Sequence, residues 1–264
     1  MLGAIIGDVS GSRFERGSIK TKYFTFLEEG CRLTDDSLMT IAVGCACVEA
    51  DLTDENSFKA CVTKYMRQIG NLYPSAGFGG NFYRWLISPH PTPYGSFGNG
   101  SAMRVSPVAY IAKTLDEAEK LARWSAEVTH DHPDGIAGAC AVAAAIYLAR
   151  EGKSKEEIKR YVESNYYNLS FTLDGIRPTY SFEIQCSKSV PEAIVCFLEA
   201  EDFEDAVRNA ISLGGDCDTQ AAIAGSIAEA FFGIPDALQE EIFDYMDETI
   251  QDYYWSYADT LYEL

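Results

Sequence analysis

The amino-acid sequence predicts an all-α fold in a single domain that spans residues 1–264. Apolar residues recur with helical spacing along most of the chain, and no Asn-Gly hairpin lies between two alternating apolar runs. There is no internal repeat, no low-complexity linker and no change of composition sharp enough to mark a domain boundary. We therefore expect one compact helical domain.

Three stretches carry the clearest helical signals. Residues 136–149 are small and apolar almost throughout, which is typical of a helix buried on most sides. Residues 220–232 repeat this pattern and stop at Gly233-Ile234-Pro235. Near the end of the chain, apolar and aromatic residues recur along one face of a predicted helix. We expect this stripe either to pack in the core or to leave one ring free to stack on a ligand base. Its members are Ile250, Tyr253, Tyr254, Tyr257 and Leu261.

The remaining long segment, residues 73–99, is rich in Gly and Pro. We expect it to be irregular, and irregular segments are where ligand contacts concentrate.

Composition excludes several classes of function. With 21 Lys and Arg against 40 Asp and Glu, the net charge is −19, which opposes non-specific nucleic-acid binding. Eight cysteines include no C-x-x-C pair, so a zinc ribbon has no support. Residues 1–11 lack a basic leader, and no run of about 18 apolar residues could span a membrane. We expect a cytoplasmic, monomeric protein that does not bind membranes.

Two acidic clusters each open an apolar helix. The first is Thr34-Asp35-Asp36, and the second is Gly214-Gly215-Asp216-Cys217-Asp218-Thr219. Either cluster alone is also explained by helix capping, because Asp and Thr are preferred N-caps. A cap needs only one acid, however, and each cluster has two. Since Mg²⁺ and Mn²⁺ prefer oxygen ligands, we expect a divalent metal site if the two helix starts meet.

A glycine-rich loop, Gly95-Ser96-Phe97-Gly98-Asn99-Gly100, leads into a helix that includes Arg104. Backbone N–H groups at such a junction can hold an anion, although a plain loop is the alternative. His130 is expected either to donate a hydrogen bond to a sugar or phosphate or to make a structural hydrogen bond. The His130-x-His132 pair lacks the further ligands that zinc needs, and no G-x-S-x-G elbow is present.

Taken in order, these motifs resemble those of the ADP-ribosylglycohydrolases. The resemblance runs from residue 3 to about residue 235. It rests on Gly3-Ala4-Ile5-Ile6-Gly7-Asp8, Glu15, Thr34-Asp35-Asp36, Gly98 to Arg104, Thr129-His130, and Gly214 to Thr219.

The resemblance implies an orthogonal all-α bundle with a binuclear centre of two Mg²⁺ or Mn²⁺ ions. The implied metal ligands are Thr34, Asp35, Asp36, Asp216, Asp218 and Thr219. The implied substrate-binding residues are Gly95, Ser96, Phe97, Gly98, Asn99 and His130. The implied catalytic residues are Glu15, Asp36 and Asp218.

Two details of this assignment stay open in the sequence. Glu15 would act as general base or general acid, with a surface ion pair to Arg13 or Arg16 as the alternative. Cys217 lies between the two aspartates and is expected to do no chemistry.

The resemblance also implies the reaction. The protein would remove ADP-ribose from a modified protein, first of all from arginine, by attack of water at the anomeric carbon. Serine-linked ADP-ribose, O-acetyl-ADP-ribose and binding of ADP-ribose without turnover are the alternatives. Choice of acceptor is expected to depend on the rim of the pocket, in residues 73–90 and 181–191.

Overall fold

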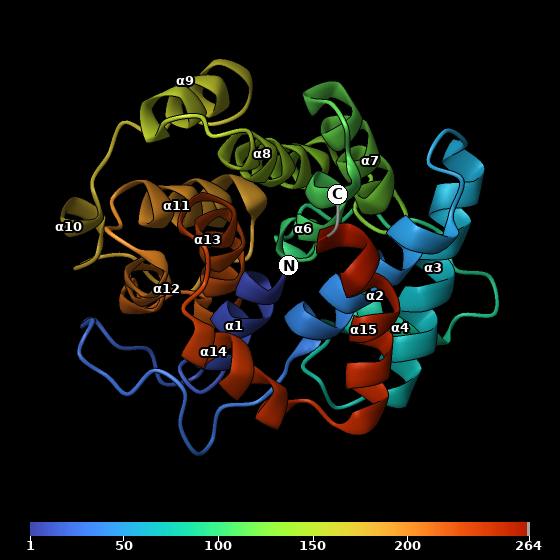
Figure 1. Ribbon diagram of the computed structural model, residues 1–264, viewed down its shortest axis with the longest axis horizontal. Helices are drawn as coiled ribbons and strands as arrows, with labels where there is room; N and C mark the ends of the chain where they lie inside the picture. Colours follow the sequence, from blue (N-terminus) through green and yellow to red (C-terminus); the bar gives the residue numbers. More distant parts are fainter. Residues whose placement is uncertain (263–264) are drawn as a thin grey trace.

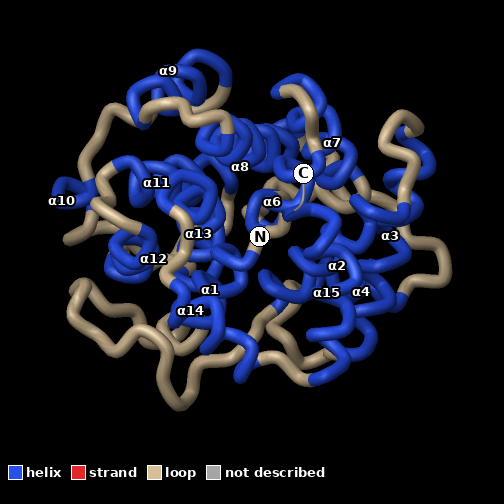
Figure 2. Tube along the Cα trace, in the orientation of Figure 1, coloured by secondary structure: helices blue, strands red, loops and turns tan. Residues whose placement is uncertain are grey.

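Helices dominate the computed structural model, which describes residues 1–262 (Figures 1 and 2). Within that range there is no strand, so the predicted all-α class is confirmed. The elements are α1 (Leu2–Gly11), α2 (Asp35–Glu49), α3 (Glu55–Leu72), α4 (Gly80–Ile87), α5 (Gly100–Met103), α6 (Ser106–Ile111), α7 (Leu115–Glu127), α8 (Pro133–Arg150), α9 (Lys155–Asn165), α10 (Leu173–Ile176), α11 (Cys186–Leu198), α12 (Phe203–Ser212), α13 (Cys217–Phe232), α14 (Asp236–Glu241), the 3₁₀ helix η1 (Ile242–Tyr245) and α15 (Glu248–Tyr262).

The predicted apolar helices form the interior. Residues 136–149 lie in α8, and residues 220–232 lie in α13, where every residue from Cys217 to Glu229 is buried. Helix α13 ends at Gly233, whose φ of 76° is a backbone conformation that favours glycine. One hydrophobic cluster runs from the first helix to the last.

Helices α1 and α13 approach each other unusually closely because α1 carries glycine at every fourth position. A methyl group added at Gly3 would lie 2.4 Å from the carbonyl oxygen of Gly225, and one added at Gly7 would lie 2.1 Å from that of Ala221. At Gly11 it would lie 2.6 Å from the Cα of Asp218. Only glycine allows two backbones this near, and the contact brings the end of α1 beside the start of α13.

The aromatic stripe of α15 is core packing. Ile250, Tyr254, Tyr257 and Leu261 are buried, while Tyr253 is half-buried. The stripe rests on α2, where a methyl group added at position 44 would lie 2.7 Å from the ring of Tyr257.

The expectation that residues 73–99 are irregular throughout was wrong for residues 80–87. These form α4, which buries Phe82, Trp85 and Leu86. The rings of Phe82 and Trp85 stack with centroids 5.4 Å apart. The Gly79-Gly80 pair at its start conceals this short amphipathic helix in the sequence. None of the helices in residues 1–262 is long and apolar enough to cross a membrane.

Candidate active site

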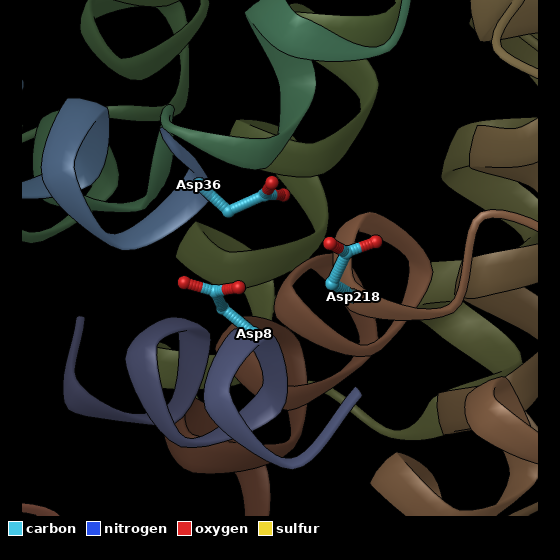
Figure 3. Close-up of side chains that lie close together, drawn as sticks. All are labelled: Asp8, Asp36 and Asp218. Carbon is cyan, nitrogen blue, oxygen red and sulfur yellow. The ribbon is translucent and has the colours of Figure 1, made fainter. Parts of the chain in front are cut away.

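The C-terminal end of α1 and the N-terminal ends of α2 and α13 meet beside a cavity of about 400 Å³. Figure 3 shows Asp8, Asp36 and Asp218, one from each helix, with their carboxylates directed into a shared space. One oxygen of each lies within 4.8 Å of one oxygen of the other two. The two acidic clusters, 181 residues apart in the sequence, therefore converge in the fold.

Asp8 was not identified as a site residue from the sequence, and it lies at the centre of this arrangement. Its fully buried carboxylate accepts hydrogen bonds from the N–H and hydroxyl of Thr34, at 3.0 and 2.7 Å. It also accepts them from the N–H of Ser37, at 3.0 Å, and from the Ser37 hydroxyl. The side chain thus caps the N-terminus of α2 from a neighbouring helix. The sequence signal that could have identified Asp8 is that it is the single acid in the otherwise mainly apolar helix α1.

The first acidic cluster combines capping with an unsatisfied carboxylate. Thr34 is the N-cap of α2, and its hydroxyl oxygen accepts a hydrogen bond from the N–H of Asp36 at 3.3 Å. The Oδ1 atom of Asp36 is buried and has no hydrogen-bond partner within residues 1–262. Asp35 lines the cavity next to it. Because the Thr34 hydroxyl caps α2, the carboxylates of Asp35 and Asp36 are not needed for capping and could bind a ligand.

In the second cluster the acids are not used as caps. Asp216 is the N-cap residue of α13, yet its side chain makes no capping hydrogen bond. It accepts one instead from the Nδ2 atom of Asn99 at 2.8 Å. Asp218 is 4% exposed and Thr219 is 5% exposed, and both line the cavity together with Asp216.

Burial and mutual repulsion raise the pKa of these carboxyl groups. The pKa of Asp35 rises to about 7, first by burial and then by the charge of Asp8. Burial, followed by the charge of Asp218, raises the pKa of Asp36 well above its ordinary value. Burial and then Asp216 raise that of Asp218 in the same way. In residues 1–262 none of these acids forms an ion pair with Lys or Arg.

The donor set fits a hard divalent cation. Buried carboxylates without counter-charges are costly, and Asp36 Oδ1 has not even a hydrogen bond among the described residues. All the converging ligand atoms are oxygens, as Mg²⁺ and Mn²⁺ require.

Glu15 follows α1 and is half-buried on the cavity wall. Its charge contributes to the raised pKa of Asp35, Asp216 and Asp218. The alternative, a surface ion pair of Glu15 with Arg13 or Arg16, is not found among residues 1–262. Arg13 pairs with Glu28 instead, and Arg16 is exposed. Glu15 itself forms no ion pair within residues 1–262.

Part of the glycine-rich loop lies on the cavity wall. Ser96, Gly98 and Asn99 line the cavity. Phe97 is 42% exposed, with its ring packed edge-on against His132, and Gly95 is also exposed.

Several of the loop's backbone donors are already used. The N–H of Gly95 donates to Asp131 Oδ1 at 2.7 Å, that of Gly98 to the Ser96 hydroxyl at 3.3 Å, and that of Asn99 to the Ile184 carbonyl at 2.8 Å. An anion would rely on the remaining donors of this loop.

His130 is 5% exposed and lines the cavity beside this loop. Burial, and then the nearby Arg104, lower its pKa well below the ordinary value, so the ring is neutral at physiological pH. His132 instead caps α8, where its Nδ1 atom accepts from the N–H of Asp134 at 3.1 Å. The two histidines therefore have separate roles.

Both segments expected to form the rim contribute to the cavity wall. Residues 79–82 come from the first segment. Phe182 and Ile184 come from the second and are about half exposed.

Comparison with known proteins identifies the family. The ADP-ribosylglycohydrolase family profile matches residues 1–264. Human ADP-ribosylhydrolase ARH3 is 29% identical, over 95% of this chain and 90% of that protein. The ADP-ribosyl-[dinitrogen reductase] glycohydrolase of Rhodospirillum rubrum is 25% identical, over 89% and 85% of the two chains. A solved ADP-ribosylglycohydrolase-related protein complex shares the fold, with a TM-score of 0.66 at 20% identity over 99% of this chain and 96% of that one. The chain belongs to the ADP-ribosylglycohydrolase family.

Proposed function

We propose that the protein is a metal-dependent hydrolase that releases ADP-ribose from a modified acceptor, with arginine-linked ADP-ribose as its first substrate. Membership of the family supports the reaction class. The observation that carries the proposal is the convergence of carboxylates from α1, α2 and α13, of which Asp36 and Asp218 line one cavity. Serine-linked ADP-ribose and O-acetyl-ADP-ribose are the competing substrates.

Two Mg²⁺ or Mn²⁺ ions are the proposed cofactors. When bound, they would supply Lewis-acid polarisation of ribose hydroxyls and water. The residues proposed to hold them are Thr34, Asp35, Asp36, Asp216, Asp218 and Thr219. Asp8 is proposed to orient this set rather than to join it, because both of its oxygens already accept hydrogen bonds from Thr34 or Ser37.

The protein's own groups would then act on the anomeric carbon. Breaking the bond to the acceptor builds positive charge on the ribose, and Asp36 and Asp218 would stabilise that charge. Glu15 is proposed as the general base: its carboxylate would accept a proton from the attacking water, whose oxygen bonds to the anomeric carbon, and would return that proton to the departing acceptor atom. Its position on the cavity wall, without an ion-pair partner in residues 1–262, supports this role.

A panel of defined substrates tests the proposal. Peptides with arginine- or serine-linked ADP-ribose, and O-acetyl-ADP-ribose, are incubated with Mg²⁺ or with EDTA, and released ADP-ribose is measured. We expect release with Mg²⁺, fastest from arginine, and none with EDTA. Faster release from either other substrate would overturn the arginine assignment. Tight ADP-ribose binding without product from any substrate would favour a binding protein.

Two variants test the site within the same assay. Asp36→Asn and Asp218→Asn should each lower the rate at least about 100-fold, because each removes a proposed ligand charge. Asp252→Asn is the matched control, since this exposed acid lies on α15 outside the cavity lining. Full activity in both cavity variants would refute metal-assisted hydrolysis.

A further inference from the structure

Arg104 is a buried cation that the proposed reaction does not yet use. It is 1% exposed, and among the residues that line the cavity it is the sole Lys or Arg. No carboxylate pairs with it within residues 1–262. Its Nη2 atom donates to the Ser125 carbonyl at 3.2 Å and to the Thr129 hydroxyl at 2.8 Å. Burying an unpaired guanidinium is costly, which indicates a role beyond packing.

The hydroxyl of Thr129 links Arg104 to His130. This hydroxyl is fully buried and lies 2.7 Å from His130 Nδ1. A guanidinium can only donate, so Thr129 uses a lone pair to accept from Arg104. If the imidazole also donated from Nδ1, the hydroxyl proton would have no acceptor in residues 1–262, which is unfavourable in the interior. The hydroxyl therefore donates to Nδ1.

This arrangement fixes where the imidazole carries its proton. A neutral ring whose Nδ1 accepts must bear its proton on Nε2. The Nε2 atom faces the glycine-rich loop: it would lie 3.2 Å from a methyl group added at Gly100 and 3.8 Å from one added at Gly98. No hydrogen bond joins Nε2 to another group within residues 1–262. An N–H donor is thus directed at the loop and is free for a ligand.

We propose that Arg104 is a positioning residue that acts through Thr129, so that neutral His130 presents its Nε2 proton to an anionic oxygen of the ligand at the Gly98–Gly100 loop. The identity of the ligand as ADP-ribose rests on the proposed function. The tautomer of His130 does not, because the protein alone determines it.

The tautomer can be read by nitrogen-15 NMR of the full chain, which has only three histidines. His90→Gln and His132→Asn assign the other two signals, and Asn keeps a good N-cap on α8. We expect His130 to carry its proton on Nε2 at neutral pH. Thr129→Val should give a mixture of tautomers, and Thr129→Ser should restore the single form. A proton on Nδ1 in the unsubstituted protein, or no change in Thr129→Val, would overturn the proposal.

Ligand binding gives a second readout that separates this proposal from the proposed function. Calorimetric titration with ADP-ribose should give a Kd about tenfold higher for Arg104→Met and Thr129→Val, and a near-normal Kd for Thr129→Ser. KM should rise by the same factor with kcat little changed, since the donor acts in binding. If Arg104→Met does not fold, Thr129→Val and Thr129→Ser still test whether the Thr129 hydroxyl sets the His130 tautomer and the Kd of ADP-ribose. An unchanged Kd in Thr129→Val would overturn the proposal, whereas absence of turnover with the predicted tautomer and Kd would refute only the hydrolase assignment.

Discussion

The close contact between α1 and α13 is tested most sharply by Gly7→Ala. An added methyl group at Gly7 would lie 2.1 Å from the carbonyl oxygen of Ala221, whereas ordinary contact begins at 3.4 Å. The helices would therefore have to separate by about 1.3 Å. Asp8 follows Gly7 directly, and Asp218 lies one turn before Ala221 on α13. Separating the two helices would therefore move the carboxylate of Asp8 away from that of Asp218.

The expected cost follows from the nature of the clash. The methyl group meets backbone atoms, which cannot rotate away, so the overpacking penalty should be about 3 kcal/mol. Alanine favours the helix over glycine by about 1 kcal/mol, which leaves a net loss of about 2 kcal/mol. Because Asp8 orients the proposed ligands, Mg²⁺ affinity should also fall by about 10–100-fold. Urea denaturation and calorimetric titration measure the two effects.

Gly17→Ala is the matched control for this prediction. A methyl group at Gly17 would have no other atom of residues 1–262 within 4 Å, so stability and Mg²⁺ affinity should stay near those of the unsubstituted protein. If Gly7→Ala also kept both properties, the close approach of α1 and α13 would not determine the geometry of the site.

Three further predictions concern the site itself. Asp8→Asn should weaken Mg²⁺ binding by about 10–100-fold, because Asp8 orients Thr34, and unchanged affinity in a calorimetric titration would contradict this. In EDTA-treated protein, Asp35 has a pKa of about 7 against an ordinary 3.8, so between these pH values the folded state binds more protons than the unfolded state. The free energy of unfolding of the EDTA-treated protein should therefore fall as pH rises from about 4 to 7, and Mg²⁺ should restore it. A thermal midpoint that rises through this interval without metal would contradict the raised pKa of the carboxylate cluster. Glu15→Gln should lower kcat by about 10²–10⁴-fold with the Kd of ADP-ribose nearly unchanged, and a normal kcat would remove Glu15 from the mechanism.

The sequence was sufficient to predict the helical class and the two acidic helix starts. Asp36 and Asp218 could be recognised because each accompanies a second acid and a hydroxyl ahead of an apolar helix, which is more than capping requires. The sequence did not predict that the two helix starts meet; it predicted a metal site only if they do. It depends on long-range packing that no local pattern encodes.

Asp8 and Glu15 show what local patterns leave out. The part played by Asp8 depends on which helix its side chain reaches, and that helix begins 27 residues later at Asp35. Glu15 stays ambiguous in the sequence because Arg13 is close along the chain, whereas in the fold Arg13 pairs with Glu28. The spacing of the α1 glycines was a local signal of a close helix approach.

The glycine-rich loop stays a predicted ligand site, but the sequence does not show which of its N–H donors are used within the protein. Its composition predicts a row of N–H donors, but those of Gly95 and Asn99 donate to tertiary partners, and that of Gly98 donates to the Ser96 hydroxyl within the loop. The partners, Asp131 and Ile184, are distant in the sequence. Phe97 likewise packs on His132 at the surface rather than lining the cavity.

Two divalent ions are proposed to bind between the starts of α2 and α13, beside the end of α1. Anomalous diffraction from a crystal soaked in Mn²⁺ measures this directly. We expect two peaks about 4 Å apart between Asp36 and Asp218. No peak between these carboxylates, at a manganese concentration that supports turnover, would contradict it.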